Sequence, residues 1–207
     1  MGNKTLHFIL ASASPRRTLL LTQIGVVHDI IPAHVDENSN LPQEPGAQVT
    51  ALAEKKALFV AGAHPDAVVL GADTVVFHQG EILGKPSNTE EACRMVERLA
   101  GSEHEVYTGI ALAGPRGRTV ESSYEVTRVR FRPLDRKHIE LYVATGEPLD
   151  KAGAYGIQGY GSTLVESVDG CYFNVMGLPI SRLIGMLAAR GIDYPFGPLR
   201  AAHQAGR

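Results

Sequence analysis

The chain has 207 residues, of which 44% are hydrophobic and 20% are charged, and its formal net charge at pH 7 is −2. This composition is ordinary for a soluble globular protein of one large domain or two lobes. The near-neutral charge argues against the strongly basic class of nucleic-acid-binding proteins, and the longest apolar runs fall short of the roughly 20 residues that cross a membrane. We therefore expect neither nucleic acid nor membrane among the partners.

The cysteines are few and far apart. Cys93 and Cys171 are the only two, and their spacing fits neither a disulfide framework nor a thiolate metal site. The amino end lacks the long apolar segment of a secretory signal peptide. We therefore expect a cytoplasmic protein with reduced thiols.

The first distinctive stretch joins an apolar strand at residues 6–10 to a helix that begins near Pro15 and ends at Gly25. Ser14 suits the N-cap and Pro15 the first helical position. Arg16 and Arg17 are disfavoured at this positive end of the helix dipole unless an anion binds there. Ser12 and Ser14 could add hydroxyl donors, so the stretch predicts a phosphate site; a solvated arginine pair on a surface helix is the alternative.

A second candidate cation follows on a long helix. Residues 26–31 are predicted to form a strand, residues 36–38 an acidic turn that includes Glu37, and residues 43–62 a helix. Lys56 interrupts the apolar face of that helix. It either reaches a functional site or extends its charged end to solvent from the edge of the core.

The next strand is predicted at residues 67–72 and leads into Asp73 and Thr74. Ligands of open α/β sheets bind beyond the carboxyl ends of strands, so Asp73 is a candidate site residue; an aspartate that caps a turn is the alternative. A hairpin of residues 75–77 and 81–83 then delivers Lys85 between a flexible glycine and a rigid proline. Thr89 is the expected cap of a helix over residues 90–99.

The middle of the chain predicts strands over residues 105–112 and 119–132, joined by a turn at 114–117, and then a helix over 134–145. Polar and apolar residues alternate along residues 126–132, which is typical of a strand with one solvated face. That alternation accounts for the arginines at 128, 130 and 132 without a nucleic-acid surface.

Five glycines fall within residues 146–161, which excludes a mainly core segment. The stretch is either a flexible linker or a loop whose backbone approaches a ligand closely. Side chains that can form specific hydrogen bonds lie between the glycines, and they favour a ligand-binding loop over a flexible linker. Gln158 can both donate and accept, which suits the edge of a nucleobase. A strand over 164–168, a helix over 180–189 and a flexible tail from 195 to 207 complete the prediction.

Two common nucleotide-binding motifs are absent from the sequence. A P-loop would need Gly-x-x-x-x-Gly-Lys-Ser/Thr, but Lys85 is followed by Pro86. The glycines of residues 153–161 do not have the Gly-x-Gly-x-x-Gly spacing between a strand and a helix that a dinucleotide fold requires.

Eight motifs together resemble the Maf family of nucleotide pyrophosphatases, in the order of that family and over about residues 6–190. They are LASASPRR at 10–17, VDE at 35–37, LAEKKA at 52–57, GADTV at 71–75, GKP at 84–86, VYTG at 106–109, GEPLDKAGAYGIQG at 146–159 and NVMGLP at 174–179.

The resemblance implies an α/β fold with a mixed sheet, two lobes and a central cleft, similar to inosine-triphosphate pyrophosphatases, as one catalytic domain over residues 1–194. It implies hydrolysis of a nucleoside triphosphate to the monophosphate and pyrophosphate, with a divalent metal cation (Mg²⁺ or Mn²⁺) as cofactor. The sequence of residues 150–159 is similar to that of the subgroup that acts on dTTP and UTP. A homodimer is a further expectation from the family.

Combined with the residue-level arguments, the resemblance gives each candidate a role. The triphosphate is expected to bind Ser12, Arg16, Arg17, Lys56 and Lys85, and the base to contact Thr74 and Gln158. Asp73 is the expected general base. Asp73 and Glu37 are also the best metal ligands, because Mg²⁺ and Mn²⁺ prefer hard oxygen donors. The sequence leaves open which of its two roles Asp73 plays.

Two alternatives to this function remain at this stage. One is a nucleotide-binding regulator of cell division that does not turn its ligand over, since members of the family are linked to septum formation. The other is the activity on 7-methyl-GTP of a sister subgroup, whose sequence differs from this chain around residues 150–159.

Overall fold

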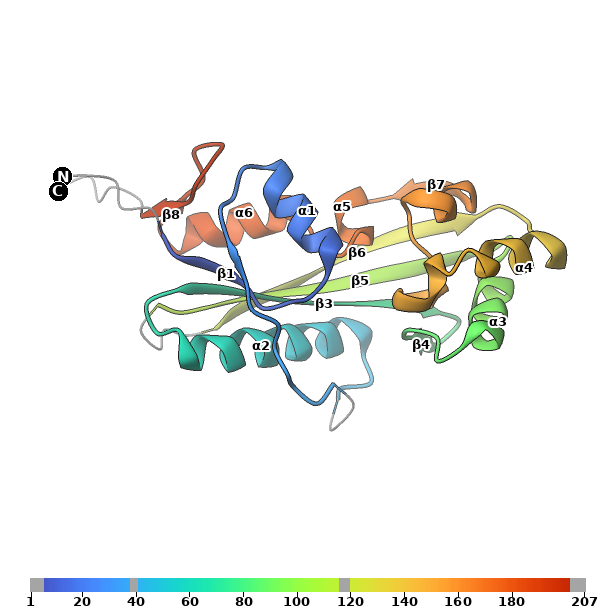
Figure 1. Ribbon diagram of the computed structural model, residues 1–207, viewed down its shortest axis with the longest axis horizontal. Helices are drawn as coiled ribbons and strands as arrows, with labels where there is room; N and C mark the ends of the chain where they lie inside the picture. The colour runs from blue at the N-terminus through green and yellow to red at the C-terminus, as the bar shows by residue number, and fades with distance from the viewer. Residues whose placement is uncertain (1–5, 38–40, 116–119, 202–207) are drawn as a thin grey trace. The chain divides into compact units, whose positions relative to one another are not determined.

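The computed structural model describes residues 6–37, 41–115 and 120–201 (Figure 1). Its centre is a mixed sheet in the order β2-β1-β3-β5-β6-β7, with β4 paired to β3. β1 is parallel to β2 and β3, whereas β4 is antiparallel to β3 and β7 is antiparallel to β6. The predicted mixed-sheet α/β class is therefore confirmed. None of the described helices is long and apolar enough to cross a membrane.

The chain divides into two compact units. The first comprises Met1–Asp73, Gly109–Tyr124 and Gly177–Arg207, and the second comprises Thr74–Thr108 and Glu125–Met176. The long strands β3 (Val68–His78), β5 (Glu103–Ala113) and β6 (Glu121–Phe131) contribute residues to both units. In β3 the boundary between the units falls between Asp73 and Thr74, the pair singled out in the sequence.

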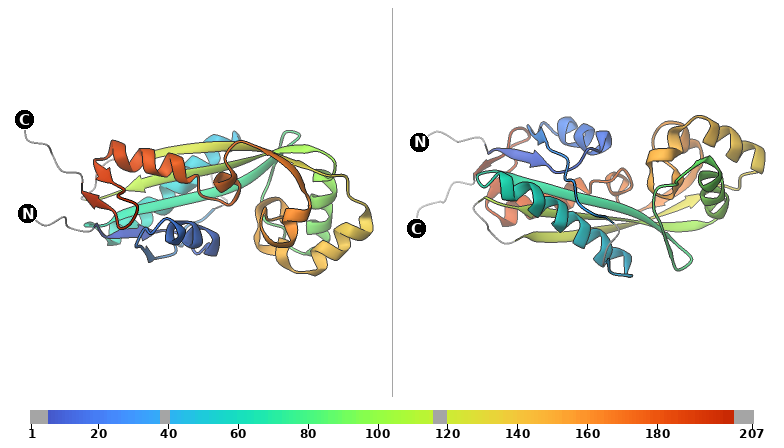
Figure 2. Two further views of the ribbon diagram at one scale, coloured as in Figure 1. Left: turned by 90° about the horizontal axis from the view of Figure 1, so that it is seen from above. Right: turned by 60° about the horizontal axis from the view of Figure 1, so that its bottom comes forward.

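The first unit packs helices against both faces of its part of the sheet, with α2 on one face and α1 and α6 on the other (Figures 1 and 2). Its remaining elements are β1 (Phe8–Leu10), α1 (Pro15–Gln23), β2 (Asp29–Ile30), α2 (Pro45–Ala63), α6 (Ile180–Ala189), β8 (Ile192–Asp193) and β9 (Arg200–Ala201).

Glycine permits the close approach of α2 to the sheet. A Cβ atom at Gly71 of β3 would overlap the carbonyl oxygen of Ala53, and one at Gly109 of β5 would overlap the backbone of Val49. Small side chains on both sides, Ala53 and Ala57 of α2 with alanines of β5, complete this layer of the core. This spacing determines how far the side chains of α2 reach over the sheet.

The second unit packs α3 beside α4 and surrounds them with short turns (Figure 1). Its elements besides the long strands are β4 (Glu81–Leu83), α3 (Thr89–Leu99), α4 (Arg136–Ala144), η1 (Glu147–Asp150), η2 (Ala152–Ala154), η3 (Gly159–Thr163), β7 (Val165–Asp169) and α5 (Tyr172–Val175). Val96, Leu99, Val129 and Phe131 are completely buried in its core.

Most predicted elements are present, but β3 is longer than predicted. The sequence placed Asp73 and Thr74 after the end of a strand, whereas both lie inside β3 (Val68–His78). The reason lies in its neighbours: β1 pairs with β3 only up to Leu70, while β4 pairs with its far end from Val76 to His78. Asp73 therefore lies on a strand that continues beyond the carboxyl end of β1.

One local prediction is confirmed and two need correction. Ser14 occupies the N-cap of α1, but its hydroxyl makes no cap hydrogen bond. Asn88, not Thr89, caps α3, because its side chain accepts from the Glu91 amide. The segment expected as a strand over 26–31 pairs only at Asp29–Ile30.

The carboxyl-terminal segment packs further than predicted. Leu199 is buried, its carbonyl accepts from the Leu6 amide, and β9 pairs with β8. Residues 195–201 of the expected tail thus belong to the packed part of the first unit. The prediction of a flexible tail for 202–207 lies outside the described residues, as do Asn38 of the acidic turn and residues 116–119 of the predicted turn and strand.

The alternation along β6 is confirmed. Thr127, Val129 and Phe131 are buried, while Arg128 and Arg130 are exposed. Each arginine pairs with a glutamate of β5, Arg128 with Glu105 at 3.7 Å and Arg130 with Glu103 at 3.3 Å. These arginines therefore form a solvated outer face.

Candidate active site

The loop after β1 holds a buried arginine. Arg17 lies in the first turn of α1, and its guanidinium donates from Nε to the Gly177 carbonyl at 2.8 Å and from Nη1 to Ser12 Oγ at 2.9 Å. The Ser14 amide also donates to Ser12 Oγ, at 3.2 Å. Burial lowers the pKa of Arg17, and the nearby Asp73 carboxylate opposes that shift.

This arrangement defines which hydrogen bonds the Ser12 hydroxyl accepts and which it can donate. Ser12 Oγ accepts from both Arg17 and the Ser14 amide, so the serine hydroxyl proton is available to a third group. Arg16, the neighbour of Arg17, is half-buried in the same turn. Arg17, which the sequence left unexplained at a helix start without an anion, thus binds the hydroxyl oxygen of a serine that can still donate its proton.

Lys56 bridges two carboxylates. Its side chain is only 10% exposed, and Nζ lies 2.7 Å from Asp73 Oδ1 and 2.7 Å from Glu37 Oε1. The adjacent Lys55 is exposed and donates instead to the Asp36 carbonyl. Of the two alternatives for Lys56, the structure thus excludes a lysine that extends to solvent.

These five residues, Ser12, Arg17, Glu37, Lys56 and Asp73, are named the charged cluster below. All belong to the first unit. The cluster lies where β1 has ended and β3 continues, which is the edge at which α/β sheets bind ligands. Its alternating charges suit a ligand that carries both phosphates and a cation.

The remaining predicted site residues belong to the second unit. Thr74 is partly exposed on β3 and Lys85 is exposed after β4. Gln158 is partly buried in the glycine-rich loop. The loop reaches the Lys85 segment directly, because the Gly153 amide donates to the Gly84 carbonyl at 2.9 Å. Lys85 and Gln158 thus lie on connected backbone.

The glycine-rich loop is a packed structure and not a linker. Glu147 accepts from the Tyr160 amide at 2.8 Å and from the Gly161 amide at 2.9 Å, which ties the two ends of the loop together. Tyr155 is buried, and its hydroxyl lies 2.7 Å from His104 Nε2. Burial lowers the pKa of His104 to about 3 and raises that of Tyr155, so this contact joins two neutral groups.

Sequence reasoning missed the polar network behind Thr74. Thr74 Oγ1 lies 2.9 Å from Thr108 Oγ1, which in turn donates to the Asn174 carbonyl at 2.9 Å. Thr108 and Asn174 are completely buried. Thr108 belongs to the VYTG motif and Asn174 to the NVMGLP motif, two of the motifs that carry the family resemblance. Their place in these motifs was the only signal in the sequence that could have marked them as site residues. These three residues are named the threonine relay below.

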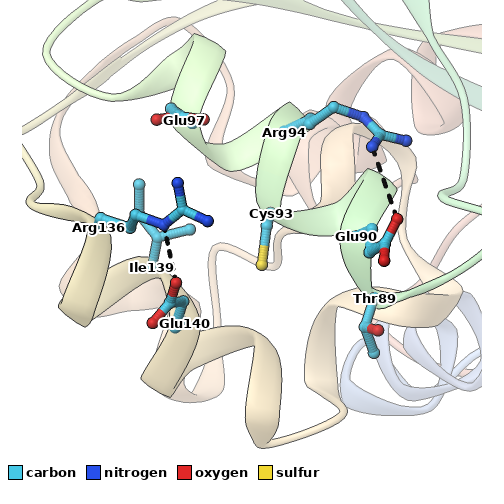
Figure 3. Close-up of a pocket in the computed structure, with 8 residues that line it drawn as sticks. All are labelled: Thr89, Glu90, Cys93, Arg94, Glu97, Arg136, Ile139 and Glu140. Carbon is cyan, nitrogen blue, oxygen red and sulfur yellow. Dashed lines mark hydrogen bonds and ion pairs between the residues drawn. The ribbon is translucent and has the colours of Figure 1, made fainter.

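A pocket of about 430 Å³ between α3 and α4 is a separate feature of the second unit (Figure 3). Its lining residues are Thr89, Glu90, Cys93, Arg94, Glu97, Arg136, Ile139 and Glu140.

The charges of this pocket do not suit a triphosphate. Arg136 pairs with Glu140 at 2.9 Å and Arg94 with Glu90 at 4.0 Å, and Glu97 adds a further negative charge. Burial raises the pKa of the Cys93 thiol, which faces the pocket, so it is not a reactive thiolate (Figure 3).

Comparison with known proteins agrees with the resemblance seen in the sequence. A protein named dTTP/UTP pyrophosphatase from Pelotomaculum thermopropionicum is 47% identical over 187 residues, 90% of this chain and 98% of that protein. One of the same name from Moorella thermoacetica is 50% identical over 189 residues, 89% of this chain and 95% of that protein. A HAM1 protein from Coxiella burnetii has 14% identity and a TM-score of 0.44 over 77% of this chain and 80% of that one. The model of the Maf-like protein family matches residues 7–190, and the chain belongs to the Maf family.

Proposed function

We propose that this chain hydrolyses dTTP and UTP to the nucleoside monophosphate and pyrophosphate, by attack of water on the α-phosphorus. The relatives that carry this name are 47% and 50% identical to it over about nine tenths of its length. The observation that carries the proposal is the buried Lys56, held at 2.7 Å from both Asp73 and Glu37. A polyphosphate site needs cations and carboxylates together, and here they are preassembled.

The triphosphate is bound by the donors of the charged cluster and its neighbours. Ser12 offers a hydroxyl proton, and the amides at the start of α1 offer the positive end of a helix dipole. Arg16 and Arg17 supply guanidinium groups that match phosphate oxygens, and Lys56 and Lys85 supply ammonium groups. Positioned charges of this kind provide most of the acceleration in phosphoryl transfer.

Asp73 takes the proton from the attacking water. Lys56 contacts Oδ1 of this carboxylate at 2.7 Å, and we assign the proton to the second oxygen. The lysine fixes the carboxylate rotamer and balances its charge. The Asp73 side chain is 13% exposed, so the carboxylate remains accessible to water. General-base assistance from a positioned carboxylate contributes about 10²- to 10⁴-fold.

The carboxylates also fit a divalent cation. Mg²⁺ is commonly held by one or two carboxylates together with substrate phosphates and water, and Glu37 and Asp73 provide those two carboxylates. No cluster of three or more acidic, histidine or cysteine ligands occurs among the described residues, so substrate oxygens would complete the shell. When bound, Mg²⁺ or Mn²⁺ neutralises phosphate charge and favours departure of pyrophosphate.

The base is read by Thr74 and Gln158 of the second unit, neutral groups that can discriminate donors from acceptors. A homodimer, a cytoplasmic location and a central cleft between the two units stay predictions. A regulator that binds nucleotides without hydrolysing them is not favoured, and neither is hydrolysis of 7-methyl-GTP, because these relatives are named dTTP/UTP pyrophosphatase.

The test is an assay of the purified chain with dTTP, UTP, CTP and 7-methyl-GTP, each with Mg²⁺, with Mn²⁺ and with a chelator. Monophosphate and pyrophosphate in equal amounts from dTTP and UTP, lost on chelation, are the expected result. Binding without pyrophosphate release would favour a regulator, and release of inorganic phosphate would place the cleavage at another bond.

A further inference from the structure

The hydroxyl groups of Thr74 and Thr108 lie on neighbouring strands, β3 and β5, at 2.9 Å from one another. Considered alone, this contact allows either oxygen to be the donor. Thr108 is completely buried, whereas Thr74 is partly exposed. The direction of the bond therefore decides what Thr74 offers to a ligand.

A third group fixes that direction. Thr108 Oγ1 also lies 2.9 Å from the backbone carbonyl oxygen of Asn174, which can only accept. A hydroxyl has one proton, and here the carbonyl takes it. Thr108 must consequently accept from Thr74, and the Thr74 proton points into the relay.

The carbonyl itself is held in place by the side chain of the same residue. Asn174 Nδ2 donates to the Val106 carbonyl and to Thr127 Oγ1, both at 2.9 Å, and the residue is fully buried. Since the Val106 carbonyl can only accept, the amide orientation is fixed as well. Reversal of the relay would leave a buried carbonyl without its donor, which is costly in a dry interior.

The consequence appears at Thr74. Because its only proton is committed to Thr108, every further hydrogen bond through its oxygen must be accepted. We propose that Thr108 is a positioning residue that sets base specificity, because it makes Thr74 a hydrogen-bond acceptor toward the substrate. This inference rests on the proposed function. An acceptor suits the N3–H group of uracil and thymine, and it opposes the unprotonated N3 of cytosine.

The test compares Thr108→Val with Thr108→Ser. Valine keeps the shape of threonine but releases the Thr74 proton, which can then be offered to cytosine. We expect the ratio of kcat/KM for UTP to that for CTP to fall about tenfold, the effect of one net hydrogen bond. Serine keeps the relay and should keep the ratio.

Thr127→Val is the matched control for a general loss of packing. Thr127 is also a buried threonine that bonds Asn174, and its other hydrogen bonds are to Cys171. Its replacement leaves the bond from Asn174 Nδ2 to the Val106 carbonyl in place. This variant should lose stability, read as a lower Tm, without a change in the UTP-to-CTP ratio. A folded Thr108→Val variant with the wild-type ratio, or with equal losses on both nucleotides, would overturn the inference.

A substrate analogue covers the case in which Thr108→Val does not fold. The wild-type chain should hydrolyse N3-methyl-UTP at least about tenfold less efficiently than UTP, because the methyl group removes the donor. Equal rates on the two nucleotides would contradict the relay. A wild-type chain that releases no pyrophosphate from dTTP or UTP would instead refute the proposed function, so the two failures are distinct.

Discussion

The charged cluster and the threonine relay are both polar and largely buried, but different forces organise them. In the charged cluster, Lys56 balances Asp73 and Glu37, and Arg17 is tethered to Ser12 and to a carbonyl. In the relay, no member carries a charge, and proton counting alone sets the direction of each bond.

The difference matches what each region is proposed to bind. A triphosphate is recognised by charge, which acts over several ångströms and tolerates imperfect alignment. A uracil ring differs from cytosine only in where its protons lie, so its discrimination needs a group of fixed hydrogen-bond direction. Predictions for the first region accordingly concern rate and phosphate affinity, and those for the second concern selectivity and pH.

The largest effect is expected for Asp73→Asn. The amide keeps the shape of the carboxylate but cannot take a proton from water, so kcat for UTP should fall about 10²- to 10⁴-fold. Binding of UTP, measured by calorimetry, should change much less. Asp29→Asn, an exposed position on β2, is the control and should retain full activity. An Asp73→Asn variant with near-normal kcat would remove this residue from the catalytic role.

Lys56→Met and Lys55→Met form a matched pair of neighbours. Loss of Lys56 leaves the exposed Glu37 and the largely buried Asp73 without their shared cation. Breaking a buried pair such as Lys56–Asp73 typically costs about 3 kcal/mol in unfolding free energy. We also expect KM for UTP to rise by at least about tenfold, since one charge-assisted hydrogen bond is worth that much. The exposed Lys55 should tolerate the change. Equal effects at the two positions would contradict the assignment of Lys56 to the charged cluster.

Gly71→Ala probes the layer that carries Lys56. The new Cβ would overlap the Ala53 carbonyl and push α2 away from β3, so unfolding free energy measured in urea should fall by about 2–3 kcal/mol. The control is Gly62→Ala in the last turn of α2, where nothing lies within 4 Å. Alanine favours helix there and should stabilise slightly. An unchanged midpoint for Gly71→Ala would mean that α2 does not depend on this close approach.

The two regions also differ in how far the sequence could predict them. Arg16, Arg17 and Lys56 stood out because charges are unfavourable at a helix start or on an apolar face, and the structure places Arg17 and Lys56 in the buried charged cluster. The choice of Lys56 over Lys55 followed from family spacing, and contacts now separate the two lysines.

The relay could not be predicted in the same way. Thr108 and Asn174 are 66 residues apart, and neither has a charge or an unusual local pattern that would mark it. Only the contact between them reveals that Thr74 is an acceptor. The length of β3 escaped prediction for a similar reason, because its far end is defined by pairing with β4 and not by its own residues.

The smallest effect concerns pH and separates the regions directly. His104, which contacts Tyr155 of the glycine-rich loop, has a pKa lowered to about 3 by burial. Between about pH 6.5 and pH 3 the unfolded chain therefore binds a proton that the folded chain excludes, so stability falls as the pH is lowered. Between pH 7 and pH 5 this histidine should account for about 1–2 kcal/mol of lost unfolding free energy. His104→Gln should reduce the loss by that amount, and His34→Gln, at an exposed histidine of the first unit, is the control. Because the second unit depends on a histidine that stays neutral, mild acid should disturb the glycine-rich loop before the charged cluster. Hydrogen exchange at pH 5 that opens the charged cluster first would contradict this order.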